Sequence, residues 1–203
     1  MKLNLPNRIT VFRIFLAIIA IIILLIPWYD LNYNFPEYVI NGEILSLKYI
    51  IVGVLFLIAS LTDFIDGYIA RSRNMVTDFG KVADAIADKV LVNGLLILLA
   101  YDRMIPIIIP VVIVTRDIIV DSCKMISGSK GKVVAASMLG KAKTMCMMIG
   151  MTLTFFGDFP FVYVNLPIDK ILLLVATILS VVSGCQYFYN TKEFLFVNNV
   201  QKK

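Results

Sequence analysis

The chain has 203 residues, of which 60% are hydrophobic and 16% are charged, and its mean hydropathy is +0.88. A soluble globular domain is about 45–50% apolar and about 25% charged, so this composition excludes an ordinary soluble protein and indicates a membrane protein. The chain contains no histidine, which excludes Ser-His-Asp and Cys-His catalysis, HExxH zinc hydrolysis and histidine phosphoryl carriers. Its net charge of +5 is typical of basic cytoplasmic loops, so we expect no nucleic-acid partner.

Six apolar segments follow one another along the chain, each close to the ~20 residues that a helix needs to cross a membrane. They cover residues 9–27, 49–70, 82–100, 104–123, 133–156 and 171–189. The first follows Pro6-Asn7, a helix-start signal, and we expect its beginning to lie along the cytoplasmic surface. The fold prediction is therefore all-α: one membrane domain over residues 1–203, a six-transmembrane-helix bundle with a short N-terminal juxtamembrane helix.

Basic residues alternate between the connections of these segments. They gather before the first segment and after the second, fourth and sixth, at Lys2, Arg8, Arg71, Arg73, Lys81, Lys124, Lys130, Lys132, Lys192, Lys202 and Lys203. Because cytoplasmic loops carry the excess of Lys and Arg, we expect a multi-pass protein with both termini in the cytoplasm. The acidic connection 29–47 has no predicted structure, although its aromatic residues are typical of the outer membrane interface.

Four aspartates lie near the cytoplasmic ends of the second and third segments. At ~100° per residue, Asp63 and Asp66 share one helix face, and Asp84 and Asp88 share a face of the next helix. A turn between the helices would bring the four carboxylates together, which predicts a site for Mg²⁺ or Mn²⁺ and a bound diphosphate. Gly67 and Gly80 leave room for a ligand, and Arg71 supplies phosphate donors. The alternative is that the aspartates pair with Arg71, Lys81 and Lys89 to hold the helices together.

Three basic residues lie within the fourth and fifth segments, namely Arg116, Lys141 and Lys143. Ionisable groups inside a membrane are costly and usually line a functional cavity. We predict that these three bind the phosphate of a phosphorylated acceptor. The alternative is that Arg116 pairs with Asp121 and that the two lysines extend to the membrane interface.

The string D-x2-D-G-x2-A-R-x8-G-x3-D-x3-D over residues 63–88 resembles the signature of the CDP-alcohol phosphatidyltransferases at every fixed position. The N-terminal residues 4–10 with Arg13 resemble the family's NxPNxxTxxR, and residues 140–144 resemble the GKxKT of its bacterial phosphatidylglycerophosphate synthase branch. The resemblance implies a six-helix fold, a homodimer among membrane lipids, and a cytoplasmic active site in a bacterial cell membrane. Residues 83–89, Arg116-Asp117 and Met147 depart from that branch, which leaves the acceptor the least certain of these inferences.

The resemblance further implies transfer of the phosphatidyl group of CDP-diacylglycerol to an alcohol, here glycerol 3-phosphate, with release of CMP. Two divalent ions, Mg²⁺ or Mn²⁺, would be held by Asp63, Asp66, Asp84 and Asp88. The donor would be bound by Asp63, Asp66, Gly67, Ala70, Arg71, Gly80 and Asp84. Asp88 would be the catalytic base, and Arg116, Lys141 and Lys143 would bind the acceptor phosphate.

Three alternatives remain open from the sequence. Within the same family, the acceptor could be inositol phosphate, serine or phosphatidylglycerol. An intramembrane prenyltransferase also uses aspartates and Mg²⁺, but its two acidic motifs usually lie far apart in sequence. A cation carrier would explain the aspartates, but fixed positive charge at Arg71 and Arg116 opposes cation entry.

Overall fold

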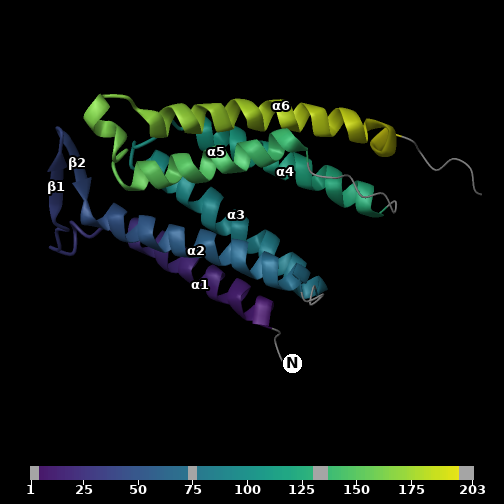
Figure 1. Cartoon of the computed structure of the whole chain (residues 1–203), viewed down its shortest axis with the longest axis horizontal. Helices are drawn as coiled ribbons and strands as arrows, with labels where there is room; N and C mark the ends of the chain where they lie inside the picture. Colours follow the sequence, from purple (N-terminus) through teal and green to yellow (C-terminus); the bar gives the residue numbers. More distant parts are fainter. Residues whose placement is uncertain (1–4, 73–76, 130–136, 197–203) are drawn as a thin grey trace, which may run out of the picture.

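A computed structural model of the chain describes residues 5–72, 77–129 and 137–196 (Figure 1). Within them, each of the six predicted apolar segments is a helix, which confirms a mostly helical fold. The helices are α1 (Leu5–Leu25), α2 (Leu47–Ser72), α3 (Asp78–Tyr101), α4 (Ile108–Ser129), α5 (Met138–Phe155) and α6 (Ile168–Phe196). A hairpin of β1 (Glu37–Ile40) and β2 (Glu43–Ser46) precedes α2, and the short 3₁₀ helix η1 (Phe161–Val164) joins α5 to α6.

The helices form two groups of three. In the first group α1 packs against both α2 and α3, and in the second α6 packs against both α4 and α5. The groups meet where α2 contacts α5 and α3 contacts α4. Figure 1 shows them close together at the hairpin end and spread apart at the other end, where α2 finishes and α3 begins. We call this second end the open end of the bundle.

Apolar side chains fill the interior and also cover the outside. Phe56 of α2 and Phe155 of α5 are fully buried with ring centroids 5.8 Å apart, beside buried leucines of α3. Outside, Phe15 and Ile22 of α1 and Leu174 of α6 are exposed. Within the described parts of the chain, two segments are long and apolar enough to cross a membrane, Asn7–Leu25 and Ile168–Lys192. Such an outer surface suits lipid rather than water, as the composition predicts.

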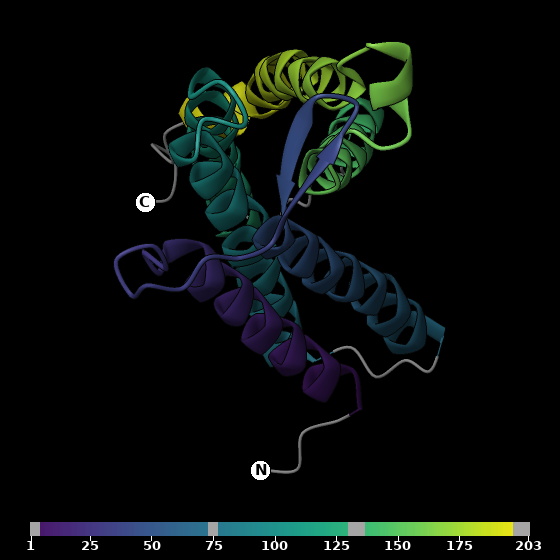
Figure 2. The ribbon, with the colours of Figure 1, turned by 90° about the vertical axis from the view of Figure 1, so that its left-hand side faces the viewer.

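The connection 29–47, for which the sequence analysis made no prediction, contains the β-hairpin. Its turn is Asn41-Gly42, with positive φ angles of 49° and 89°. Asn-Gly is the strongest short-range signal for a two-residue hairpin, because both central residues need φ > 0. The Asn41 side chain donates a 2.8 Å hydrogen bond to the Val162 carbonyl oxygen, and Figure 2 shows the hairpin crossing this end of the bundle. The hairpin therefore ties the two helix groups together away from the open end.

Most helix ends differ by a few residues from the predicted segments, and two differences have a consequence or a clear cause. Helix α1 runs unbroken from Leu5 to Leu25, so the described chain has no separate juxtamembrane helix, and residues 1–4 lie outside the description. Helix α4 begins at Ile108 rather than at residue 104. A tight turn with Arg103 at φ 61° precedes it, and Pro106 disfavours the helical conformation of Ile105 before it.

The packing of α5 on α6 depends on Gly150. A Cβ atom there would lie 2.9 Å from Leu173 Cγ and 3.3 Å from the Asp169 carbonyl oxygen of α6. We expect Gly150→Ala to lower the thermal unfolding midpoint, corresponding to about 1–3 kcal/mol of overpacking. Gly128 of α4 is the matched control, since a Cβ there meets nothing within 4 Å and alanine favours a helix. Equal midpoints for the two variants in detergent would contradict this account.

Candidate active site

The predicted carboxylates meet at the open end through a residue of α1. The guanidinium of Arg13, only 1% exposed, forms ion pairs with Asp63 of α2 and with Asp84 of α3. Among the described residues, α2 and α3 make few direct contacts, so α1 brings the two carboxylates together rather than the direct packing we predicted. The alternative partner Lys89 pairs with Asp121 of α4 instead. Asp63 and Asp84 thus face one shared position, which the guanidinium of Arg13 occupies.

Helix α1 contributes a polar face that the sequence analysis did not assign to the site. Asn7, Thr10 and Arg13 are buried on an otherwise apolar helix and recur every three residues. Asn7 Nδ2 donates a 3.0 Å hydrogen bond to Thr77 Oγ1, the side-chain cap at the start of α3. A Cβ atom on Gly80 would lie 2.7 Å from Asn7 Oδ1. The absence of a side chain at Gly80 therefore lets Asn7 approach α3. The spacing of three residues between buried polar groups is the sequence pattern that indicates this polar face.

The remaining residues of the acidic motif are described unevenly. Asp88 lies one helical turn after Asp84 and lines a neighbouring cavity. The side chains of Asp66, Ala70 and Arg71 lie outside the part of the structure in which side chains are described. Across the described residues, no group of three or more acidic or cysteine side chains is close enough together to hold a metal ion. The two described carboxylates that share Arg13 already fit a cation, because their oxygens converge on positive charge.

The cavity beside Asp88 has a volume of about 630 Å³ and lies between α3, α4, α5 and α6. All three predicted acceptor-binding residues, Arg116, Lys141 and Lys143, line it together with Asp88. Among the described residues, its charged lining comprises five cations and three carboxylates, an excess of two positive charges: Lys89, Arg116, Lys124, Lys141 and Lys143 against Asp88, Asp117 and Asp121. Such a lining favours an anion with about two negative charges.

Arg116 is held by α6 and by its own neighbour in sequence. Its Nη1 lies 2.9 Å from Asp117 Oδ1, its Nε donates to the Ser180 carbonyl oxygen at 3.1 Å, and its Nη2 donates to Ser183 Oγ at 2.8 Å. Arg116 packs closely against Gly184 of α6, where a Cβ atom would lie 2.9 Å from Arg116 Cγ. The alternative pairing of Arg116 with Asp121 is therefore wrong, because the acid one turn earlier takes that role.

The two lysines differ in their surroundings. Lys143 is 4% exposed, and its Nζ lies 2.6 Å from Asp117 Oδ1, so it does not extend to the membrane interface. Lys141 is exposed at the cavity and forms no ion pair with the described residues. One carboxylate, Asp117, thus serves two of the three predicted cations, and Lys141 keeps its charge available.

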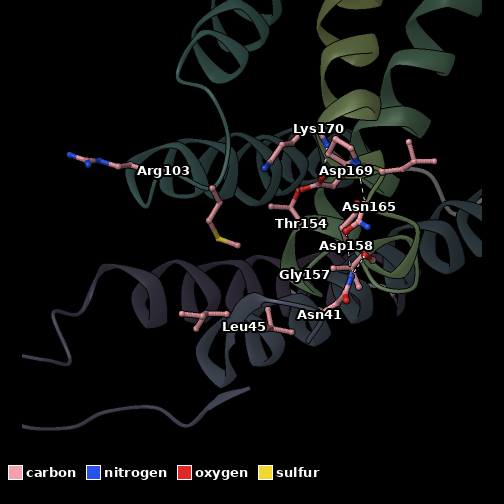
Figure 3. Close-up of a pocket in the computed structure, with 14 residues that line it drawn as sticks. Asn41, Leu45, Arg103, Thr154, Gly157, Asp158, Asn165, Asp169 and Lys170 are labelled. Atoms are coloured by element: carbon pink, nitrogen blue, oxygen red, sulfur yellow. Dashed lines mark hydrogen bonds between the residues drawn. The ribbon is translucent and has the colours of Figure 1, made fainter. Parts of the chain in front are cut away.

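A second cavity, of about 400 Å³, lies at the hairpin end (Figure 3). Its carboxylates are used within the fold. Asp158 accepts hydrogen bonds from the backbone N–H groups of Ile168 and Asp169, and Asp169 accepts one from Thr154 Oγ1 at 3.1 Å. These bonds cap the start of α6. The predicted catalytic residues whose side chains are described lie at the opposite end.

Comparison with known proteins covers nearly the whole chain. The CDP-diacylglycerol–glycerol-3-phosphate 3-phosphatidyltransferase of Bacillus subtilis strain 168 is 38% identical over 196 residues, which are 97% of this chain and 99% of its own. The enzyme of the same name from Rickettsia bellii is 33% identical over 193 residues, 94% of this chain and 97% of its own. The profile of the CDP-alcohol phosphatidyltransferase family matches residues 3–182. The chain therefore belongs to the CDP-alcohol phosphatidyltransferase family.

Proposed function

We propose that the chain transfers the phosphatidyl group of CDP-diacylglycerol to glycerol 3-phosphate, producing phosphatidylglycerophosphate and CMP. The observation that carries the proposal is the cavity in which Asp88 faces an excess of positive charge, one helical turn from Asp84. The relatives named above carry the same activity in their names. Serine has no phosphate and phosphatidylglycerol carries about one negative charge, so the excess of two favours a phosphate monoester.

The metal site of this proposal consists of Asp63, Asp66, Asp84 and Asp88, holding two ions of Mg²⁺ or Mn²⁺. Its support is that Asp63 and Asp84, from different helices, already converge on one positive charge. Carboxylate oxygens are the hard ligands that these ions prefer. When bound, the two ions would neutralise the donor diphosphate and stabilise the departing CMP.

The donor would lie along the acidic motif, bound by Asp63, Asp66, Gly67, Ala70, Arg71, Gly80 and Asp84. This motif lies at the open end, where the two helix groups spread apart (Figure 1). We place this end at the cytoplasmic face of a bacterial membrane, with six helices crossing it and both termini inside, because the basic connections gather there. We also expect a homodimer.

The acceptor would bind in the cavity, with its phosphate on Lys141 and near Arg116 and Lys143. Asp117 fixes the positions of Arg116 and Lys143, so their charge is oriented before the acceptor arrives. Asp88 is within electrostatic reach of Arg13, Asp84, Asp117 and Lys143, which places it between the acidic motif and the basic cavity. It takes the proton of the acceptor hydroxyl as that oxygen bonds to phosphorus and the bond to CMP breaks.

The reaction itself provides the first test. Purified protein should release CMP from CDP-diacylglycerol with glycerol 3-phosphate and Mg²⁺ or Mn²⁺, and EDTA should abolish the release. The same assay with serine and phosphatidylglycerol should give little product, because these acceptors do not match the charge of the cavity. Inositol phosphate matches the charge, but the relatives are named for glycerol 3-phosphate, so we expect little product with it as well. Metal-dependent product with another acceptor would overturn the choice of glycerol 3-phosphate, and no product with any of them would overturn the transferase.

Asp88→Asn tests the catalytic base. The amide retains the size of the side chain but cannot accept the proton, so we expect kcat to fall at least about 100-fold, since general-base catalysis contributes about 10²–10⁴. Binding of CDP-diacylglycerol, measured by isothermal titration, should remain detectable. Near-normal turnover would remove Asp88 from this role.

Lys141→Ala tests the acceptor pocket. Loss of one charge-assisted hydrogen bond of about 1.5–3 kcal/mol should raise the KM for glycerol 3-phosphate roughly 10- to 100-fold while the donor KM stays nearly constant. Lys170→Ala is the matched control, because Lys170 is an exposed lysine that lines the cavity at the hairpin end. An unchanged acceptor KM for Lys141→Ala would exclude this lysine from phosphate binding.

A further inference from the structure

Arg13 is a charged group buried almost completely in the N-terminal half of α1. Transferring a guanidinium out of water costs several kcal/mol unless carboxylates compensate its charge. Asp63 and Asp84 provide that compensation, and Nε of Arg13 has no hydrogen-bond partner among the described residues. Arginine remains protonated at any physiological pH, so this charge is permanent.

The two acids that neutralise Arg13 belong to the motif to which we assign the divalent ions. The same carboxylates thus face two kinds of cation, one attached to α1 and the other arriving from solution. An entering ion is repelled by the guanidinium and must also weaken its ion pairs. The diphosphate of the donor brings negative charge that offsets this repulsion.

We propose that Arg13 is a positioning residue that acts as an internal counter-cation, competing with divalent ions for Asp63 and Asp84. Divalent ions then bind weakly to the free enzyme and more tightly once the anionic diphosphate is present. This coupling is reciprocal, so the ions strengthen diphosphate binding by the same factor. The inference rests on the metal site of the proposed function and adds a role for α1.

The test measures ion binding without turnover. Free Mn²⁺ is followed by electron paramagnetic resonance during titration of the purified protein, in wild type, Arg13→Gln and Lys89→Gln. We expect Arg13→Gln to bind Mn²⁺ at least about 10-fold more tightly than wild type, equivalent to about 1.4 kcal/mol. Lys89→Gln is the matched control: it also removes one positive charge near Asp88, but Lys89 pairs with Asp121 rather than with Asp63 or Asp84.

Salt and nucleotide separate direct competition from a general effect of charge. Any increase in Mn²⁺ affinity that Lys89→Gln shows should shrink at 0.5 M NaCl, because salt screens exposed charges. The increase in Mn²⁺ affinity of Arg13→Gln should persist, because Arg13 is buried. Addition of CDP, with chelation in solution corrected by a titration without protein, should tighten Mn²⁺ binding more in wild type than in Arg13→Gln. If the role of Arg13 were purely structural, CDP would tighten Mn²⁺ binding by the same factor in wild type and in Arg13→Gln.

The outcomes distinguish the two proposals. If wild type binds no Mn²⁺ with or without CDP, the metal site itself is wrong. If wild type binds Mn²⁺ and Arg13→Gln binds it equally or more weakly, the counter-cation role is wrong and the metal site stands. If Arg13→Gln does not fold, Arg13→Lys decides, because an ammonium lacks the guanidinium fork and should bridge the two acids less well. Arg13→Lys should then bind Mn²⁺ more tightly than wild type, and equal affinity would overturn the role.

Discussion

Charged groups in this bundle must find partners inside it, because its outer surface is apolar. The ion pairs of Arg13 with Asp63 and Asp84 meet this requirement by joining the first three helices, α1, α2 and α3. The pairs of Asp117 with Arg116 and Lys143 do the same for α4 and α5. In each case a charge that lipid would exclude is retained at one end of the molecule, where it is also available for chemistry.

The two ends of the bundle use polar groups differently. At the hairpin end, Asp158 and Asp169 bind backbone N–H groups, and Asn41 links the hairpin to the α5–α6 connection. These bonds complete the ends of elements and close the structure. At the open end the polar groups form ion pairs, chiefly within each helix group, with a cavity beside them. The stable end thus holds the helices together while the other end leaves space for substrates.

The sequence predicted the helices well, because a run of about 20 apolar residues has few structures open to it in lipid. The residues that the sequence assigned to catalysis and to the acceptor phosphate line one cavity, and their roles stay predictions: Asp88, Arg116, Lys141 and Lys143. The sequence did not predict which aspartate forms the ion pair with Arg116. Asp117 and Asp121 are one turn apart, and the pairing depends on how α4 is rotated against α6. The role of α1 was missed because Asn7, Thr10 and Arg13 were treated as a motif and not as a helix face. Asp66 and Arg71 stay predictions.

The proposed site combines two regions of opposite charge, which would let one enzyme bind two anionic substrates. The basic cavity would attract a phosphate directly, whereas the acidic motif would repel a diphosphate until cations neutralise it. Asp88 lies at the boundary of the two, on the same helix as Asp84 and in the same cavity as Lys141. In the proposed reaction, this position would let Asp88 approach both the metal site and the acceptor hydroxyl.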